Sequence, residues 1–72
     1  MQRYKNHSGN SGVKAYEIKE TAIRVQFSKG DIYTYSYSSA GRDAVEAMKD
    51  LAKKGKGLST YISKYLKDNY ER

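Results

Sequence analysis

The chain has 72 residues, a formal net charge of +6 and no cysteine. A domain of this length hides only about 60–65% of the surface of its unfolded chain, so the core must be thin. Without cysteine the chain has neither a disulfide nor a thiolate metal site, and its single histidine cannot build a zinc site alone. No uncharged apolar stretch is long enough for a signal sequence or a membrane span, so we expect a cytoplasmic protein without a membrane partner.

The first twelve residues are polar and end in the glycine-rich run Ser8-Gly9-Asn10-Ser11-Gly12. They contain almost nothing to bury. We therefore predict a flexible polar tail over residues 1–12 and a single domain over residues 13–70.

Three short runs rich in β-branched and aromatic residues follow, at residues 13–18, 21–27 and 32–37. Lys19-Glu20 and the segment 28–31 separate them, a spacing typical of a three-stranded antiparallel meander. In the second run Ile23, Val25 and Phe27 alternate with polar residues, as in a half-buried strand.

The register of the second hairpin stays open at this point. With the loop Lys29-Gly30, Phe27 pairs with Ile32, and the tyrosines of the third strand lie on the face opposite the core. With a bulged loop of residues 29–31 the same tyrosines lie over the core. A shift of one residue therefore decides the role of Tyr33, Tyr35 and Tyr37.

Beyond Ser38-Ser39 the apolar period becomes helical. One stripe comprises Ala44, Val45, Met48, Leu51 and Ala52, and Gly55 stops the helix. A second helix is predicted over residues 58–69, with these residues facing in: Leu58, Ile62, Tyr65 and Leu66. The expected fold is α+β, a three-stranded antiparallel β-meander packed against two C-terminal helices (βββαα). The predicted core comprises Ile23, Val25, Phe27, Val45, Met48, Leu51, Ile62 and Leu66.

No catalytic arrangement is recognisable. The one imidazole, His7, lies in the predicted tail, and the carboxylates, such as Asp43 with Glu46, occupy exposed helical spacings among lysines. We therefore expect no enzyme, no catalytic residue, no metal and no cofactor. Gly55-Lys56-Gly57 has two interpretations, a simple turn or a phosphate-binding site ahead of the second helix, and the turn is favoured.

The lysines concentrate on the two predicted helices and their connection: Lys49, Lys53, Lys54, Lys56, Lys64 and Lys67. Such a cluster favours phosphate binding, although Lys53 and Lys54 also suit a helix C-terminus and Lys64 could pair with Asp68. The predicted nucleic-acid-binding residues are Lys53, Lys54, Lys56, Lys64 and Lys67 for phosphates, with Arg24, Tyr33 and Tyr35 as stacking residues.

Several of these features occur together in a known family. They are Ser11-Gly12-Val13, a strand pair ending at Phe27, a lysine-glycine turn, Tyr33-Thr34-Tyr35, a short helix, and a Gly-Lys-Gly stretch followed by Ile62. Over residues 11–65 the chain resembles the KTSC domain, a short module that occurs alone and at the C-terminus of some lysyl-tRNA synthetases. The resemblance implies a KTSC-like α+β domain, and the attachment to synthetases implies RNA binding.

We therefore expect a non-enzymatic, basic module that binds RNA or single-stranded DNA with little sequence specificity. The alternative is a protein-interaction module, an accessory or mobile-element protein that docks on a larger partner through its tyrosine-rich face. A homo-oligomer that encloses a small anionic ligand is a third hypothesis.

Overall fold

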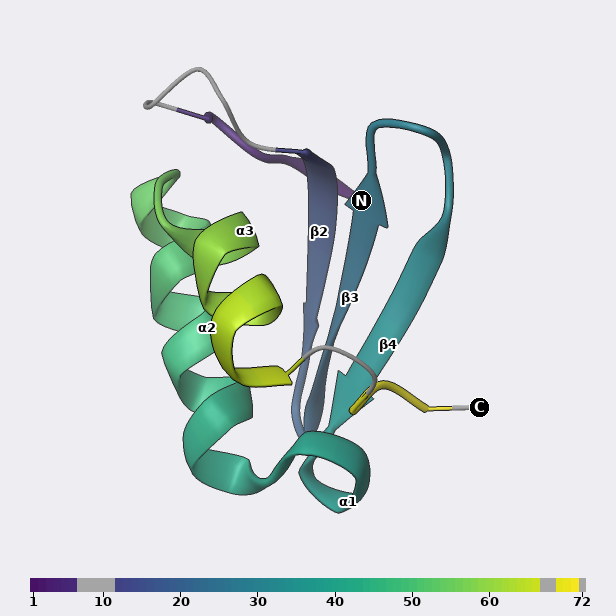
Figure 1. Ribbon diagram of the computed structural model, residues 1–72, viewed down its shortest axis with the longest axis vertical. Helices are drawn as coiled ribbons and strands as arrows, with labels where there is room; N and C mark the ends of the chain where they lie inside the picture. The colour runs from purple at the N-terminus through teal and green to yellow at the C-terminus, as the bar shows by residue number, and fades with distance from the viewer. Residues whose placement is uncertain (7–11, 67–68, 72) are drawn as a thin grey trace.

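In the computed structural model, which describes residues 1–6, 12–66 and 69–71, four strands form one antiparallel sheet in the order β1-β2-β3-β4. The strands are β1 (Gln2–Arg3), β2 (Val13–Lys19), β3 (Ala22–Phe27) and β4 (Ile32–Ser36). Helices α1 (Tyr37–Ala40), α2 (Arg42–Lys54) and α3 (Leu58–Tyr61) and the π-helix η1 (Ile62–Leu66) follow. Figure 1 shows α2 and α3 on the same side of the sheet. The α+β class is confirmed, with one strand more than the three predicted.

The additional strand belongs to the segment predicted as a polar tail. Gln2 and Arg3 pair with Tyr16 and Ala15, and the Tyr4 amide donates to the Lys14 carbonyl over 3.0 Å. Tyr4 is 3% exposed and belongs to the core. The buried ring of Tyr4 therefore anchors a segment whose other residues are mostly polar and gave no sign of burial. Residues 7–11, which include His7, lie outside the described residues.

The register of the second hairpin places the strand tyrosines on the helix-covered face. Ile23 lies opposite Tyr35, and Val25 opposite Tyr33. The Phe27 amide donates to the Asp31 carbonyl over 2.8 Å, so the loop is residues 28–30, one residue earlier than the bulged loop considered from the sequence. The strand tyrosines lie on the face that the bulged loop predicted, because the observed register and the bulged register differ by two residues.

The core lies between this face and the helices. Ile23, Val25, Val45, Met48, Ile62 and Leu66 are buried as predicted, whereas Phe27 and Leu51 are partly buried at the margin. The inward position predicted for Tyr65 is wrong, because this side chain is 61% exposed.

The helix boundaries follow local chemistry. Gly55 ends α2 in the left-handed conformation (φ 75°), and its amide donates to the Leu51 and Ala52 carbonyls, as a C-terminal glycine is expected to do. Ser36 and Ser39 form a capping box around the single turn of α1, which the sequence did not predict. The second predicted helix begins at Leu58, but it is one α-turn continued by the wider turn of η1.

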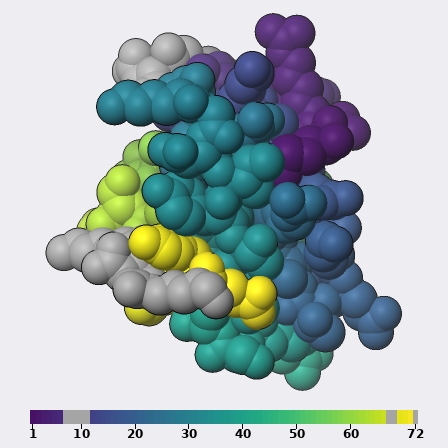
Figure 2. Space-filling model, turned by 90° about the vertical axis from the view of Figure 1, so that its right-hand side faces the viewer, coloured from purple at the N-terminus to yellow at the C-terminus, as the bar shows by residue number. Residues whose placement is uncertain are grey.

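The last described residues, 69–71, lie over β4 (yellow on teal in Figure 2). The Tyr70 ring stacks on Tyr33 with centroids 4.5 Å apart, and the Glu71 amide donates to the Thr34 carbonyl over 2.6 Å. This segment therefore covers part of the edge strand.

We predict that Tyr4→Phe lowers the free energy of unfolding by about 1 kcal/mol, because the buried Leu58 amide, 3.3 Å from the Tyr4 hydroxyl, loses its acceptor. Tyr65→Phe, the same change at an exposed ring, should stay within about 0.5 kcal/mol of the wild type. Urea unfolding measures both. Equal effects of the two changes would argue against a structural role for residues 2–4.

Candidate nucleic-acid interface

One end of the molecule collects exposed basic side chains from both the sheet and the helices. At this end, uppermost in Figure 1, β2 begins, the β3–β4 hairpin turns, α2 ends and α3 begins. Arg3 and Lys5 join them because β1 pairs with the first half of β2. We call this surface the basic end; its exposed members are Arg3, Lys5, Lys14, Lys29, Lys53, Lys54 and Lys56.

The opposite end carries charges of both signs. Glu20 lies in the β2–β3 turn, and Asp43 and Glu46 lie in the first half of α2, beside Lys19 and Arg42. Asp31, directly after the hairpin loop, is an acidic residue at the basic end. The excess positive charge of the chain is therefore unevenly distributed along its long axis.

Tyr4 joins the two halves of the basic end. Its hydroxyl accepts the hydrogen bond from the Leu58 amide at the start of α3, so β1 is held against the connection between α2 and α3. Beside it lies an open hollow whose lining includes Arg3, Lys5 and Lys14. The basic residues of the sheet and the lysines close to the start of α3 consequently lie at the same end of the molecule.

The Gly55-Lys56-Gly57 segment is a turn in this structure. Both glycines adopt left-handed conformations, with φ of 75° and 82°. The Leu58 amide that a phosphate would need at the helix start already donates to Tyr4. Within this segment, the exposed Lys56 side chain is the group that can contact an anion.

The residues proposed from the sequence do not form one site. Lys53, Lys54 and Lys56 lie together at the basic end, whereas Lys64 lies on η1 and Lys67 falls outside the described residues. The predicted stacking residues are separated. Arg24 lies on the other face of the sheet, where its guanidinium pairs with Glu17 at 3.1 Å.

The two strand tyrosines are engaged inside the fold. Tyr35 is 2% exposed and packs in the core. Tyr33 is half-buried, with the ring centroid of Phe27 at 5.5 Å and that of the stacked Tyr70 ring at 4.5 Å. Tyr35 therefore offers no surface to a ligand in this structure.

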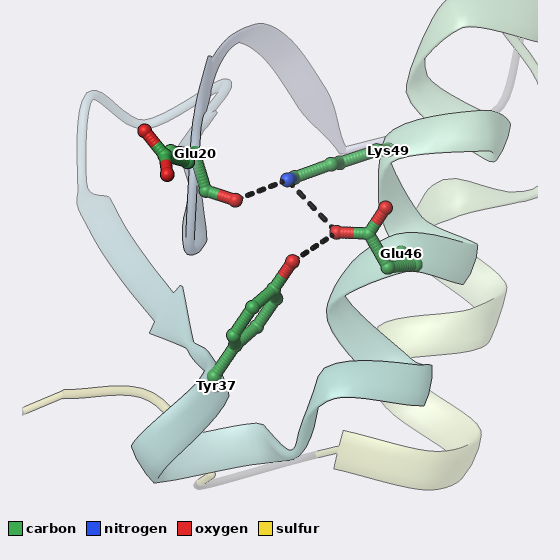
Figure 3. A network of polar contacts seen from close by, with 4 residues as sticks. All are labelled: Glu20, Tyr37, Glu46 and Lys49. Carbon is green, nitrogen blue, oxygen red and sulfur yellow. Dashed lines mark hydrogen bonds and ion pairs between the residues drawn. The ribbon is translucent and has the colours of Figure 1, made fainter.

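Lys49, which the sequence grouped with the phosphate-binding lysines, has a structural role. Its side chain is only 10% exposed, and its ammonium donates to the Glu20 carbonyl at 3.0 Å and pairs with Glu46 at 2.9 Å (Figure 3). The Tyr37 hydroxyl donates to the same Glu46 oxygen at 2.7 Å. This network ties α2 to the β2–β3 turn and to α1, and it removes Lys49 from the set available to a polyanion.

The network shifts two pKa values. The hydrogen bond from Lys49, followed by that from Tyr37, lowers the pKa of Glu46 below its ordinary value of 4.5, because both bonds favour the carboxylate. The bond to Glu46 raises the pKa of Tyr37 above 10.0, because ionisation would break it and place two negative charges together.

Sequence reasoning missed two groups of residues. Arg3, Lys5, Lys14 and Lys29 were not linked to the helix lysines, although an antiparallel meander followed by a returning helix places their segments at one end. The buried position of Lys49 had a signal as well. It follows Val45 by four residues and precedes Ala52 by three, which places it on the buried stripe.

Among the described residues no group of three or more His, Asp or Glu side chains could hold a metal ion. Within the same part of the chain, no helix combines the length and apolar character needed to cross a bilayer. Comparison with protein-family models, curated proteins and solved structures finds no match to this chain. The resemblance to the KTSC domain therefore stays a prediction.

We predict that the stabilising effect of Glu46 disappears in acid. A carboxylate whose pKa is lowered by folding stabilises the fold above its ordinary pKa, and this contribution is lost as the pH falls through the folded value. In urea unfolding, Glu46→Gln should therefore be less stable than the wild type at pH 7 and approach it at pH 3.

The control is Asp50→Asn, the same change of charge on the same helix but outside the network, which should follow the wild type at both pH values. The stabilising effect of Tyr37 has the opposite pH dependence to that of Glu46, because folding raises the pKa of Tyr37. Its raised pKa means that its hydrogen bond is present below pH 10.0 and is lost as the pH rises beyond it. A gap between Glu46→Gln and the wild type that is equal at pH 7 and pH 3 would contradict the proposed linkage.

Proposed function

We propose that this chain is a non-enzymatic module that binds RNA or single-stranded DNA, with the basic end holding the phosphates. The observation that supports this most concerns six exposed basic residues that lie at the same end of the molecule. They are Lys53, Lys54 and Lys56 near the end of α2, and Arg3, Lys5 and Lys14 from the sheet and the residues beside it. Three separate segments thus place exposed positive charge at the same end of the molecule. A charge that served only solubility would not need such a concentration.

Phosphate contacts would account for the affinity. Each lysine or arginine that neutralises a phosphate releases a counterion, so binding weakens as salt is added. Four contacts with a single strand give a slope of about −3 in a plot of log K against log salt, and a loss of about 50-fold between 50 and 200 mM salt. Because such contacts position a strand without reading its bases, sequence specificity should be low.

The fold favours a protein partner docked on the tyrosine face of the sheet less. Helices cover that face, Tyr35 lies in the core and Tyr33 carries the Tyr70 ring. Docking there would require the C-terminal residues to leave β4. The KTSC resemblance, a prediction from the sequence, points toward RNA and is in line with the proposal.

We predict that the double variant Lys53→Gln/Lys56→Gln binds a single-stranded 12-mer RNA more weakly and with a salt slope reduced by about 1.4, since two phosphate contacts are lost. Fluorescence anisotropy between 50 and 200 mM salt measures both quantities. Stability should change little, because both side chains are exposed.

The matched control is Lys19→Gln/Arg42→Gln, which removes the same charge from exposed positions at the opposite end. This variant should keep nearly the wild-type slope. Identical losses in the two double variants would show that net charge alone governs binding, and the basic end would not be the interface.

A further inference from the structure

The most exposed large hydrophobic side chain of the described residues is Tyr65, 61% exposed on η1. A soluble domain can leave a tyrosine in water, so exposure alone indicates nothing. The informative features are the two side chains beside this ring. Tyr61 lies one turn before it, and Lys64 precedes it in the chain.

The ring is held from one side. The Tyr61 ring is half-buried, packs against the core and lies 5.0 Å from the Tyr65 ring at an interplanar angle of 50°. Tyr61 thus limits the directions that Tyr65 can take, because a ring packed against the core cannot move aside easily. A partly fixed aromatic ring loses less conformational entropy when a flat ligand stacks on it.

The cation lies at the ring itself. The Lys64 ammonium is 5.5 Å from the Tyr65 ring centre, within the range of a cation–π contact. Lys64 is exposed and has a long flexible side chain, so its ammonium can move to a nearby phosphate while the ring receives a base. A stacking ring with an adjacent lysine suits a nucleotide, which combines a flat base with a phosphate.

The π-helix explains why the ring faces solvent. In an α-helix, Tyr65 and Leu66 would lie on either side of the line through Ile62, and both would be partly buried. In η1 the wider i→i+5 turn brings Leu66 closer to the line of Ile62 and turns Tyr65 away from it. Ile62 and Leu66 are accordingly buried while Tyr65 is exposed. Short π-helical turns of this kind are frequent at functional sites.

We propose that Tyr65, supported by Tyr61 and accompanied by Lys64, is a stacking site for an unpaired nucleobase. The inference rests on the proposed function, which it extends by naming the residue that selects single strands over duplex. A base in a duplex is already stacked between its neighbours, whereas an unpaired base can lie on an aromatic ring. The basic end then attracts the strand, and Tyr65 distinguishes its form.

We predict that Tyr65→Ala weakens binding of a single-stranded 12-mer RNA by about 5- to 150-fold, the range expected for one lost base stack. Binding of the matching duplex and of inorganic polyphosphate, which has no bases, should stay within about twofold of the wild type. Tyr65→Phe keeps the ring and should keep the affinity for the single strand. Fluorescence anisotropy measures the affinities for the labelled single strand and duplex, and competition against the labelled single strand measures the affinity for polyphosphate.

Two further variants show whether the effect belongs to the ring. Ser63→Ala, an exposed change in the same π-helix, should leave every affinity unchanged. Tyr65→Trp introduces the chain's sole tryptophan, and its emission should be quenched by the single strand and not by polyphosphate. Thermal unfolding of Tyr65→Ala should match the wild type, because the removed ring is exposed.

The outcomes separate this proposal from the proposed function. A wild-type chain that binds no nucleic acid even at 50 mM salt overturns both. A wild type that binds the single strand while Tyr65→Ala binds it equally well overturns the stacking site alone. The stacking site also fails if Tyr65→Ala weakens the single strand, the duplex and polyphosphate by the same factor, which would assign the ring a general electrostatic or structural role.

Discussion

The pairing of β3 with β4 fixes the faces of the whole molecule. The turn of residues 28–30 sets Tyr35 opposite Ile23 and Tyr33 opposite Val25, so aromatic and aliphatic side chains share one face. A face of that composition has to be covered, and α2, α3 and η1 cover it. Had the register shifted by one residue, the tyrosines would face solvent and the core would lose Tyr35, one of its largest buried side chains.

The covering helices also determine where the charges lie. Since α1 turns the chain at the far end of β4, α2 must run back along the sheet and finish beside the start of β2. Its last turn carries Lys53 and Lys54, a favourable placement at a helix C-terminus. The same residues thus stabilise the helix end and build the positive surface, so the two interpretations of these lysines are compatible. Tyr4 completes the arrangement by holding β1, with Arg3 and Lys5, against the start of α3.

The sequence predicted the features that depend on local pattern. The stripe through Val45, Met48 and Ala52, the glycine stop at Gly55 and the alternation in β3 all reflect periodicities that burial imposes. It could not predict β1, because two paired residues and one buried tyrosine leave no periodicity. It could not choose between hairpin registers, because both loops suit the same residues. The exposed position of Tyr65 depends on a π-turn, which no sequence period distinguishes from an α-helix over five residues.

Lys49 shows why net charge is a poor guide to an interface in so small a domain. It lies only four residues from Lys53 on α2, yet it is nearly buried and bound to Glu46 and the Glu20 carbonyl. A thin core leaves room for such a residue, since the long aliphatic part of lysine covers apolar surface while its ammonium reaches polar partners. A basic residue therefore contributes to binding only where the fold leaves its charge in solvent. By that criterion the exposed positive charge is concentrated where β2 begins and α2 ends, and the total of +6 is shared between that surface and the fold itself.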